Sequence, residues 1–443
     1  MVRQRVPSDD WNAIEGQVPK TSPNFTFQSR PLRVAAHKAV RYKKLAAFLL
    51  LIIFGVCFWF SYTHVVRYFF GGIPLMARFS RPDNHDAPRT TLGHVGLVLI
   101  AHDRPEYLRQ CLKHLFLARS LDKVDLIVSM DEASNFQKLL SVVNDFASEQ
   151  HPFIVWDNTL PPDSFTHSST DHITAHHRQI LDKLFLTGKY EFGIILETDL
   201  TVSTDFIEYM LQTAPLLHPI NPSSESLWCI SGWNDNGIGI FTWRENRLFR
   251  TDFYPGLGWM THKSRWLASL RNEWPSSVSG HNYDVWLRND SSLKQLDCIS
   301  PEVSRTHHVA KYGTHVNGDA PAFYESMMLA SGNVEISRQE IWTVGSLYEY
   351  ETRIASEFLL HSSATVHVDG NVHPIEVPKN STIIIFANDE NRNAPNSIES
   401  VLGDLKLWGD RRGMHRGLIS VRLATQGTNV TVVAERMRKY WGL

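Results

Sequence analysis

Cysteine is scarce in this 443-residue chain, and the sequence carries almost no net charge. Its four cysteines, Cys57, Cys111, Cys229 and Cys298, are too few for a disulfide scaffold, although one bridge would suit an oxidising compartment. A formal net charge of −2 gives no global electrostatic case for a polyanionic ligand, so we expect no nucleic-acid partner. The 21 histidines form no HExxH motif and no Cys/His zinc spacing, so the sequence predicts no dedicated zinc site.

A long uncharged run lies near the N-terminus, over residues 45–66. It begins LAAFLLLIIFGVCFWF and has about the length needed to span a bilayer. Arg41, Lys43 and Lys44 precede it directly, and a basic flank on that side keeps the N-terminus cytoplasmic. We therefore expect a single-pass type II anchor, with the rest of the chain in a lumen or outside the cell. A cleaved signal peptide is the alternative, although the preceding polar region is long and no clean cleavage site follows the run.

The hydrophobic content of 43% is enough for a sizeable core divided into two or three pieces. Residues before the anchor lack periodicity and predict a disordered tail, whereas Gly and Pro among charged residues after it predict a stem. The expected segments are a cytoplasmic tail at 1–44, the anchor at 45–66, a stem at 67–93, a main domain at 94–335 and a small C-terminal domain at 336–443.

Strand and helix patterns alternate through the first half of the main domain. Apolar runs that predict strands lie at 95–101, 124–130, 153–156 and 192–196. Apolar residues at three- and four-residue spacing predict helices at 106–118, 134–147, 171–186 and 204–211. This alternation predicts an α/β fold with a mostly parallel sheet and helices on both faces. We expect Thr204 to cap the last of these helices, and strands at 365–368 and 382–387 in the second domain.

Three polar residues, Arg104, Asp131 and Asp199, follow the ends of predicted strands. Ligands of such sheets bind at the carboxyl ends of the strands, so one cleft should gather these side chains. A carboxylate at Asp199 suits a hard divalent cation such as Mg²⁺ or Mn²⁺. A plain turn acid is an equally good interpretation of this segment taken alone.

Four aromatic-rich blocks further along the chain occur in an order that one family shares. They read SLWCISGWNDNG at 226–237, LFRTDFYPGLGWM at 248–260, EWP and then YDVWLR within 273–288, and PEVSRT at 301–306. Together with Glu197-Thr198-Asp199, they resemble glycosyltransferase family 13 over about residues 95–318. The resemblance implies a nucleotide-sugar-binding glycosyltransferase A-type fold. It also implies the family's founding activity, which is transfer of N-acetylglucosamine (GlcNAc) from UDP-GlcNAc.

The resemblance also assigns roles to individual residues. Asp199 would hold Mn²⁺ on the donor diphosphate, and Asp284 would be the general base. The positions that match donor-binding residues are Arg104, Asp131, His176, Glu197, Thr198, Leu257 and Tyr283. Taken singly, some of these residues have simpler interpretations. His176 is then a helix-surface imidazole, Leu257 lies in a tight turn between two glycines, and Asp284 is an acid at a helix N-terminus.

The cysteines agree with the family only in part. The resemblance implies a disulfide between Cys229 and Cys298 and a free, buried Cys111. A second family bridge is absent, because His102 and Glu132 occupy its two positions. Two further departures lie in the expected site, where Thr198 stands in place of an acid and Tyr283 in place of a tryptophan. These departures put the donor affinity and the choice of acceptor in question.

The implied reaction is an inverting, metal-dependent transfer in β-1,2 linkage to a terminal α-1,3-mannose of high-mannose N-glycans. It would take place at the Golgi membrane and would start the synthesis of hybrid and complex N-glycans. One alternative is transfer to O-linked mannose on protein. Another is a membrane-anchored sugar-binding protein without catalysis. The presence of Asp199 and Asp284 argues against the latter, since a lectin needs neither a metal at a leaving group nor a base.

Overall fold

The computed structural model describes most of the chain after residue 92. The described ranges are 93–159, 169–242, 244–276, 283–289, 292–311, 320–359, 364–365, 381–408, 410–423 and 427–443. The expected tail, the anchor and the stem up to residue 92 lie outside them. No helix within these ranges is both long enough and apolar enough to cross a bilayer.

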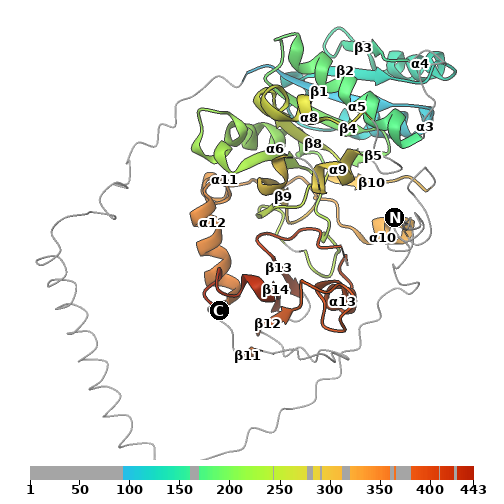
Figure 1. Ribbon diagram of the computed structural model, residues 1–443. Helices are drawn as coiled ribbons and strands as arrows, with labels where there is room; N and C mark the ends of the chain where they lie inside the picture. The colour runs from blue at the N-terminus through green and yellow to red at the C-terminus, as the bar shows by residue number, and fades with distance from the viewer. Residues whose placement is uncertain are drawn as a thin grey trace, which may run out of the picture. The chain divides into compact units, whose positions relative to one another are not determined.

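A mixed eight-stranded sheet forms the centre of the main domain (Figure 1), in the order β3-β2-β1-β4-β8-β6-β9-β7. Its strands are β1 (Val95–Ala101), β2 (Asp125–Met130), β3 (Phe153–Asp157), β4 (Phe192–Glu197), β6 (Leu227–Ser231), β7 (Leu248–Thr251), β8 (Trp259–His262) and β9 (Asp297–Pro301). The first four are mutually parallel, which confirms the predicted alternation. β8 runs antiparallel between β4 and β6, and β7 runs antiparallel to β9 at the edge.

Helices cover both faces of this sheet because successive side chains of a strand point to opposite sides. Leu97 and Leu99 of β1 belong to one apolar cluster, together with α3 (Pro105–Leu115), α4 (Phe136–Phe146) and α6 (Phe206–Thr213). Val98 belongs to the cluster on the other face, which includes α5 (Ser169–Leu186). Shorter helices are α7 (Lys263–Arg265), α8 (Arg271–Glu273), α9 (Tyr283–Asn289) and α10 (Ala320–Ser326).

One helix start differs from the prediction. Thr204 does not cap α6, because the helix begins at Phe206 and Asp205 occupies the N-cap position without a side-chain capping hydrogen bond. The Thr204 hydroxyl donates instead to the backbone carbonyl of Ser331, at 3.4 Å. The threonine therefore joins two distant loops rather than a helix end.

The predicted disulfide is confirmed. Cys229 of β6 and Cys298 of β9 are direct partners in neighbouring parallel strands, with their Cα atoms 4.6 Å apart. Cys111 of α3 is buried and unbridged, also as predicted. Its burial raises the pKa of the thiol well above the ordinary value, so this cysteine behaves as an apolar core residue.

The C-terminal part of the chain adds a four-stranded sheet in the order β11-β12-β14-β13. Its strands are β11 (Ala364–Thr365), β12 (Thr382–Ala387), β13 (Leu418–Leu423) and β14 (Thr428–Ala434), and its helices are α11 (Arg338–Gly345), α12 (Leu347–Ile354) and α13 (Ile398–Asp404). The strand predicted at 382–387 is confirmed. The one predicted at 365–368 is present at Thr365, and its other residues lie outside the described ranges.

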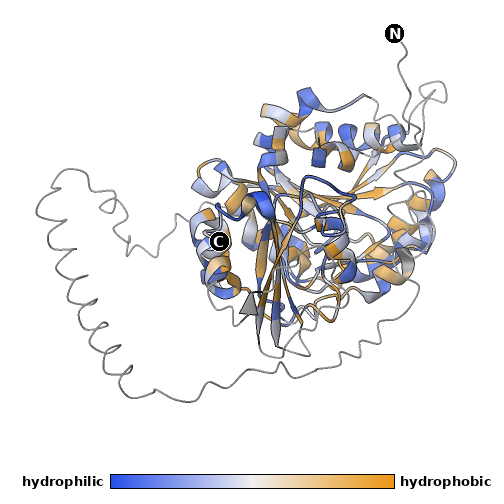
Figure 2. Cartoon of the chain, turned by 60° about the horizontal axis from the view of Figure 1, so that its bottom comes forward, coloured by the Kyte–Doolittle hydropathy of each residue, from blue (hydrophilic) through white to orange (hydrophobic). Residues whose placement is uncertain are grey.

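The second sheet shares its core with the main domain. Ile384 and Phe386 on one face belong to the large cluster of the main sheet, whereas Ile383 and Ile385 on the other face pack in a cluster with α13. Figure 2 shows apolar residues concentrated on the strands, while the helices carry both polar and apolar stretches. The boundary expected near residue 336 therefore crosses a continuous apolar core.

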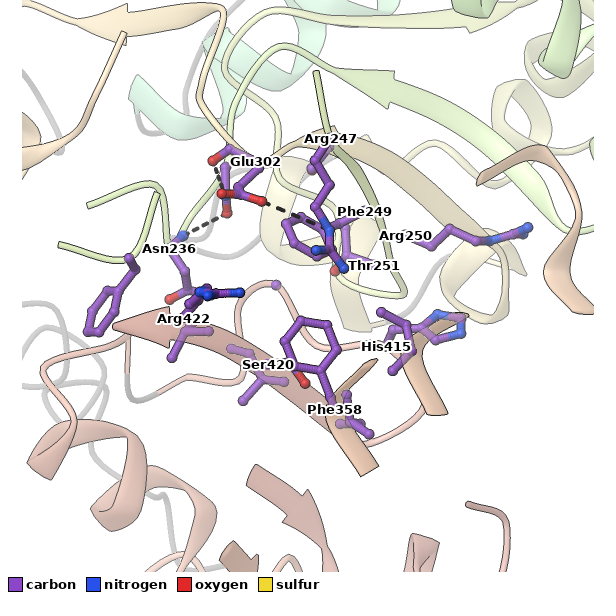
Figure 3. Close-up of a pocket in the computed structure, with 18 of the residues that line it drawn as sticks. Asn236, Arg247, Phe249, Arg250, Thr251, Glu302, Phe358, His415, Ser420 and Arg422 are labelled. Atoms are coloured by element: carbon purple, nitrogen blue, oxygen red, sulfur yellow. Dashed lines mark hydrogen bonds and ion pairs between the residues drawn. The ribbon is translucent and has the colours of Figure 1, made fainter. Parts of the chain in front are cut away.

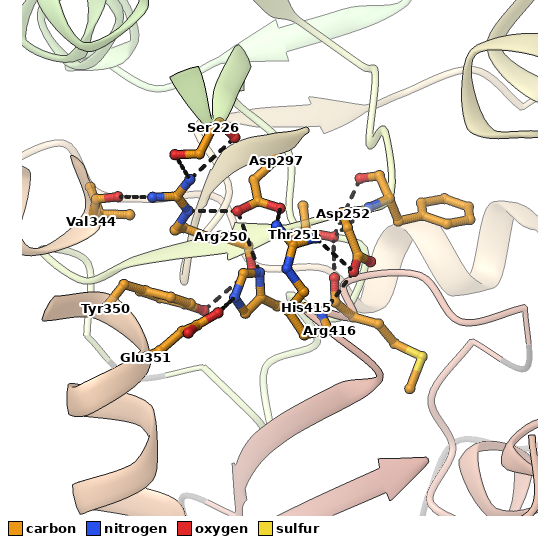
Figure 4. A network of polar contacts seen from close by, with 12 residues as sticks. Ser226, Arg250, Thr251, Asp252, Asp297, Val344, Tyr350, Glu351, His415 and Arg416 are labelled. Carbon is orange, nitrogen blue, oxygen red and sulfur yellow. Dashed lines mark hydrogen bonds and ion pairs between the residues drawn. The ribbon is translucent and has the colours of Figure 1, made fainter. Parts of the chain in front are cut away.

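A buried polar network also joins the two parts (Figure 4). Arg250 of β7 donates from Nε to Asp297 of β9 at 2.8 Å, and neither side chain is exposed. Its other donors reach the backbone carbonyls of Val344 and Ser226. His415, which precedes β13, lies with Nδ1 3.6 Å from the same Asp297. A buried arginine is tolerated only where its charge and donors are satisfied, so this network holds α11 and the second sheet against β7 and β9.

The network makes stability depend on pH through His415. Burial alone would lower the pKa of His415, but the nearby carboxylate of Asp297 and the hydrogen bond to Glu351 raise it above the ordinary value. A raised folded-state pKa means that the stabilisation is complete below the unfolded value of about 6.5 and is lost as the pH rises through the folded value.

We therefore predict that the free energy of unfolding falls as the pH rises from 6 to 8.5, and that the fall is smaller in His415→Gln. Glutamine retains a hydrogen-bond donor but does not titrate. Urea unfolding of both proteins at several pH values provides the measurement. Parallel pH profiles would contradict this role for His415.

Candidate active site

The ends of β1, β2 and β4 bring together the polar residues that the sequence places after strands. Ala101 pairs with Met130, and Ile100 pairs with Glu197, so the three strands stop at one level of the sheet. Arg104 Nη2 then donates to Asp199 Oδ2 at 3.0 Å. Two of the predicted cleft residues are therefore in direct contact, and Asp131 follows the adjacent strand.

Asp199 lies between β4 and the short strand β5 (Leu200–Val202), which pairs antiparallel with β10 (Thr306–His308). This pairing brings His308 Nε2 to 3.7 Å from Asp199 Oδ2. Oδ1 is buried, and no described residue donates a hydrogen bond to it. A buried carboxylate oxygen without a partner is costly unless something else binds it. The residues therefore fit a divalent cation held by one protein carboxylate, the arrangement that Mg²⁺ and Mn²⁺ adopt with substrate phosphates.

A second carboxylate, Asp284, lies in the first turn of α9. Arg288 Nη1 lies 2.8 Å from Asp284 Oδ2, and Arg288 Nε donates to the carbonyl of Tyr254 at 3.0 Å. Oδ1 of Asp284 is buried, and no hydrogen bond from the described residues reaches it. Arg288 thus fixes one oxygen of the carboxylate and leaves the other available.

Glu197, at the end of β4, links the two aspartates electrostatically. Its pKa is raised to about 8. Burial is the largest cause, and the negative charges of Asp199 and then Asp284 also contribute to the rise. Charge effects of this kind act over short distances inside a protein. Asp199 and Asp284 therefore belong to one electrostatic environment, although they are far apart in the sequence.

Asp131 is the centre of a histidine cluster. It accepts hydrogen bonds from His102 Nδ1 and His172 Nε2, both at 2.8 Å, and its Oδ2 lies 2.9 Å from His176 Nδ1. Burial alone would raise the pKa of Asp131, but these three imidazoles hold it well below its ordinary range. His176 is 2% exposed, so the interpretation of it as a helix-surface imidazole is wrong. Its Nε2 forms a hydrogen bond with the Ser129 hydroxyl at 2.6 Å.

Leu257 lies in a turn with three successive left-handed residues. The φ angles are 69° at Gly256, 48° at Leu257 and 84° at Gly258. The Leu257 carbonyl accepts from the Thr306 hydroxyl at 2.7 Å, which fixes the turn against β10. The tight-turn geometry is thus confirmed, and the strained φ of a leucine marks a position that its surroundings hold in place.

The remaining expected donor residues, Thr198 and Tyr283, are buried. The Tyr283 ring lies among aromatic side chains, with its centroid 4.0 Å from the His177 ring and 5.6 Å from the Trp274 ring. Burial raises the pKa of the Tyr283 phenol well above its ordinary value, with further contributions from Glu197 and Asp284. Tyr283 is thus close to the acidic group while its ring belongs to the apolar core.

Sequence reasoning missed His102, His172 and His308 as parts of this region. His308 follows the PEVSRT block by two residues, so its neighbourhood was indicated but its role was not. His102 was noted as standing in place of a family cysteine. His172 lies in the first turn of a predicted helix and carries no local signal.

A separate cavity lies between the two parts of the chain (Figure 3). Its volume is about 360 Å³, and it lies between β7 and β9 on one side and β13 on the other. Arg247, which lines the cavity, forms ion pairs with Glu302, at 3.9 Å, and with Glu357. None of the predicted site residues is among the described residues that line it. This cavity is thus distinct from the acidic cluster of Glu197, Asp199 and Asp284.

Comparison with known proteins places this geometry in context. A family model described as the GNT-I family matches residues 81–368. A protein from Arabidopsis thaliana named alpha-1,3-mannosyl-glycoprotein 2-beta-N-acetylglucosaminyltransferase is 29% identical over 248 residues, which is 55% of this chain and 53% of that protein. The chain thus spans about half the length of this relative.

Similarity to solved structures is remote. A mannosyltransferase from Pyrobaculum calidifontis, in complex with GDP-Man and Mn²⁺, is 11% identical with a TM-score of 0.32, over 48% of this chain and 55% of that one. S. aureus TarS 1–349 in complex with UDP-GlcNAc is 11% identical with a TM-score of 0.34, over 60% of this chain and 67% of that one. Scores this low carry no argument about the site.

The geometry of the turn at Leu257 leads to a stability prediction. A Cβ atom at Gly258 would lie 2.6 Å from Thr306 Cγ2, and the φ of 84° disfavours any side chain. We predict that Gly258→Ala lowers the free energy of unfolding by about 1–3 kcal/mol.

Gly403→Ala is the matched control, because Gly403 lies in α13 and a Cβ there meets no atom within 4 Å. This control should leave stability unchanged or raise it by up to about 1 kcal/mol. Chemical denaturation of both variants makes the comparison. Equal stabilities would show that the turn is not constrained by β10.

Proposed function

The chain belongs to the GNT-I family, and from this premise we propose that it transfers GlcNAc from UDP-GlcNAc to a mannose-terminated glycan with inversion, using Mn²⁺. One observation carries the proposal. Asp199 and Asp284 each leave a buried carboxylate oxygen without a hydrogen bond from the described residues, and both act on Glu197. This arrangement is compatible with a metal ligand and a general base that serve one sugar nucleotide.

In this proposal Asp199 holds the cation. Arg104 binds its Oδ2, so Oδ1 is the oxygen that would hold the metal. When bound, Mn²⁺ offsets the negative charge that develops on the departing UDP. Thr198 contributes a hydroxyl where the family has an acid, so the cation is surrounded by less negative charge. We expect weaker metal binding as a consequence.

Asp284 takes the proton of the acceptor hydroxyl. Oδ2 is held by Arg288, so Oδ1 is the oxygen that accepts the proton. As the proton leaves, the hydroxyl oxygen forms a bond to the anomeric carbon while the bond to the UDP oxygen breaks on the opposite face. The configuration at that carbon is inverted, and no covalent bond to the enzyme forms.

The donor would extend from the histidine cluster to the acidic cluster. We propose that Asp131 and His176 bind the uridine end, and that Glu197, Thr198, Leu257 and Tyr283 surround the ribose and the sugar. The support is the family match over residues 81–368, a range that contains these positions, and the common end level of β1, β2 and β4.

The acceptor we propose is the terminal α-1,3-mannose of high-mannose N-glycans, joined in β-1,2 linkage. The name of the Arabidopsis relative supports this choice, although the aligned region covers only 53% of that protein. Transfer to O-linked mannose on protein is the second candidate. We further propose that the enzyme is a type II protein of the Golgi membrane. The basic flank before residue 45 supports that orientation.

Two substitutions separate the proposed roles. Asp284→Asn should bind UDP-GlcNAc and Mn²⁺ as the wild type does, but its transfer rate should fall by about 10²–10⁴-fold because the general base is lost. Asp199→Ala should lose Mn²⁺-dependent binding of the donor. The measurements are calorimetric donor binding and transfer to a panel of N-linked and O-linked mannose acceptors.

Asp145→Asn serves as the control, since Asp145 is an exposed partner of Arg109 and should change neither quantity. Turnover near the wild-type rate in Asp284→Asn would remove this residue from the mechanism. Donor binding that does not depend on Asp199 would remove the metal site. The acceptor that is used decides between the two glycan classes.

A further inference from the structure

We propose that His102, Asp131 and His172 form a Zn²⁺ site, and that zinc bound there competes with the uridine end of the nucleotide donor. The zinc site follows from the arrangement of these side chains. The competition rests on the proposed function, because it requires that Asp131 also binds the donor.

The three side chains already converge. His102 Nδ1, a carboxylate oxygen of Asp131 and His172 Nε2 all lie within 4.8 Å of one another. Each nitrogen is 2.8 Å from an Asp131 oxygen. Zinc held by bonds of about 2.0–2.1 Å keeps its ligand atoms about 3.3 Å apart in a tetrahedron. His102 contacts Oδ1 of Asp131 and His172 contacts Oδ2. The oxygen that binds zinc must therefore move about 0.5 Å away from its own histidine, while the other imidazole turns towards the metal.

The ligand chemistry selects zinc over the cation expected at Asp199. Two imidazoles and one carboxylate suit Zn²⁺, whereas Mn²⁺ and Mg²⁺ prefer oxygen ligands. The Asp199 site offers a carboxylate oxygen, and His308 is its nearest described imidazole, 3.7 Å from the carboxylate oxygen that also binds Arg104. The two sites therefore differ in the metal that they favour.

A second layer of hydrogen bonds holds the cluster. Asn158 Nδ2 donates to the Ser129 hydroxyl at 2.7 Å, and that hydroxyl is hydrogen-bonded to His176 Nε2 at 2.6 Å. His176 Nδ1 then contacts Asp131 Oδ2 at 2.9 Å. Partners of this kind orient a metal-binding carboxylate and raise metal affinity. The buried His176 thus shares Oδ2 of Asp131 with His172, while His102 contacts Oδ1.

The site is accessible from solvent. The side chains of His102 and His172 are 48% and 22% exposed, whereas Asp131 is 4% exposed. Zinc can therefore enter from the His102 side, and water can complete its coordination. Asp103 and Glu132 add negative charge near His102. Each of these features favours a cation.

Zinc and the donor would use the same carboxylate. Asp131 has two oxygens, and the metal together with His176 occupies both. A nucleotide base that depends on Asp131 is then left without its partner, so zinc acts as a competitive inhibitor with respect to the donor. His102 and His172 therefore make donor binding by this chain sensitive to zinc.

The test begins with ZnCl₂ alone. The full chain, purified in detergent without an affinity tag, is titrated with Zn²⁺ in the absence of nucleotide. We expect one tight site in the wild type, and a loss of affinity of at least about tenfold in His102→Ala and in His172→Ala. His94→Ala, at an exposed histidine before β1, should bind zinc as the wild type does. Asp199→Ala should also retain the site. Unchanged zinc binding in both His102→Ala and His172→Ala would overturn the site.

The competition is measured separately, as UDP binding at fixed Mn²⁺ with increasing Zn²⁺. The apparent Kd for UDP should rise with zinc in the wild type and in His94→Ala, but not in the variant with both His102→Ala and His172→Ala. UDP affinity that ignores bound zinc would overturn the competition. Zinc binding without any UDP binding would leave the site standing and would instead contradict the proposed transferase. X-ray anomalous scattering at the zinc edge provides a direct check of the ligands that does not depend on the variants.

Discussion

The carboxyl ends of β1, β2 and β4 stop at one level of the sheet, and the rest of the site depends on this alignment. Parallel pairing in this register places the residues that follow each strand beside one another. Arg104, Asp131 and Asp199 come from three separate strand ends, so no local folding unit holds them together. Carboxylates crowded near Glu197 repel one another. The packing of the buried strands on both faces of the sheet offsets this loss of stability.

The antiparallel part of the sheet positions two further features, the turn at Leu257 and the buried ion pair of Asp297. β8 lies between β4 and β6 and places the turn at Leu257 next to β10. β9 carries Asp297, which binds Arg250 and faces His415 from the second domain. Burying an ion pair costs desolvation energy that the pair itself barely recovers. Its contribution is instead specificity, because one approach of the second domain places His415 and the Val344 carbonyl beside this pair.

The sequence predicted the elements that local patterns determine. The first four strands and their helices follow from short apolar runs and helical spacing, and β12 was predicted at its observed bounds. The antiparallel insertion of β8 was not predicted, because pairing order depends on long-range packing. The Thr204 cap was wrong, since Asp205 rather than Thr204 directly precedes the helix. The Cys229–Cys298 bridge and the site positions Asp131 and His176 came from the family resemblance. The contacts of His102 and His172 with Asp131 were not predicted, because these histidines lie 29 and 41 positions from it in the sequence.

Leu257 has a further consequence for the way the molecule works as a whole. Its side chain packs against the apolar clusters of both sheets, while its carbonyl is fastened to Thr306. Close-packed interiors transmit displacement rather than absorb it. A shift of the second sheet therefore displaces this leucine, and with it β10, the strand that carries His308. Leu257 is thus one of the residues through which the C-terminal sheet contacts the turn beside β10.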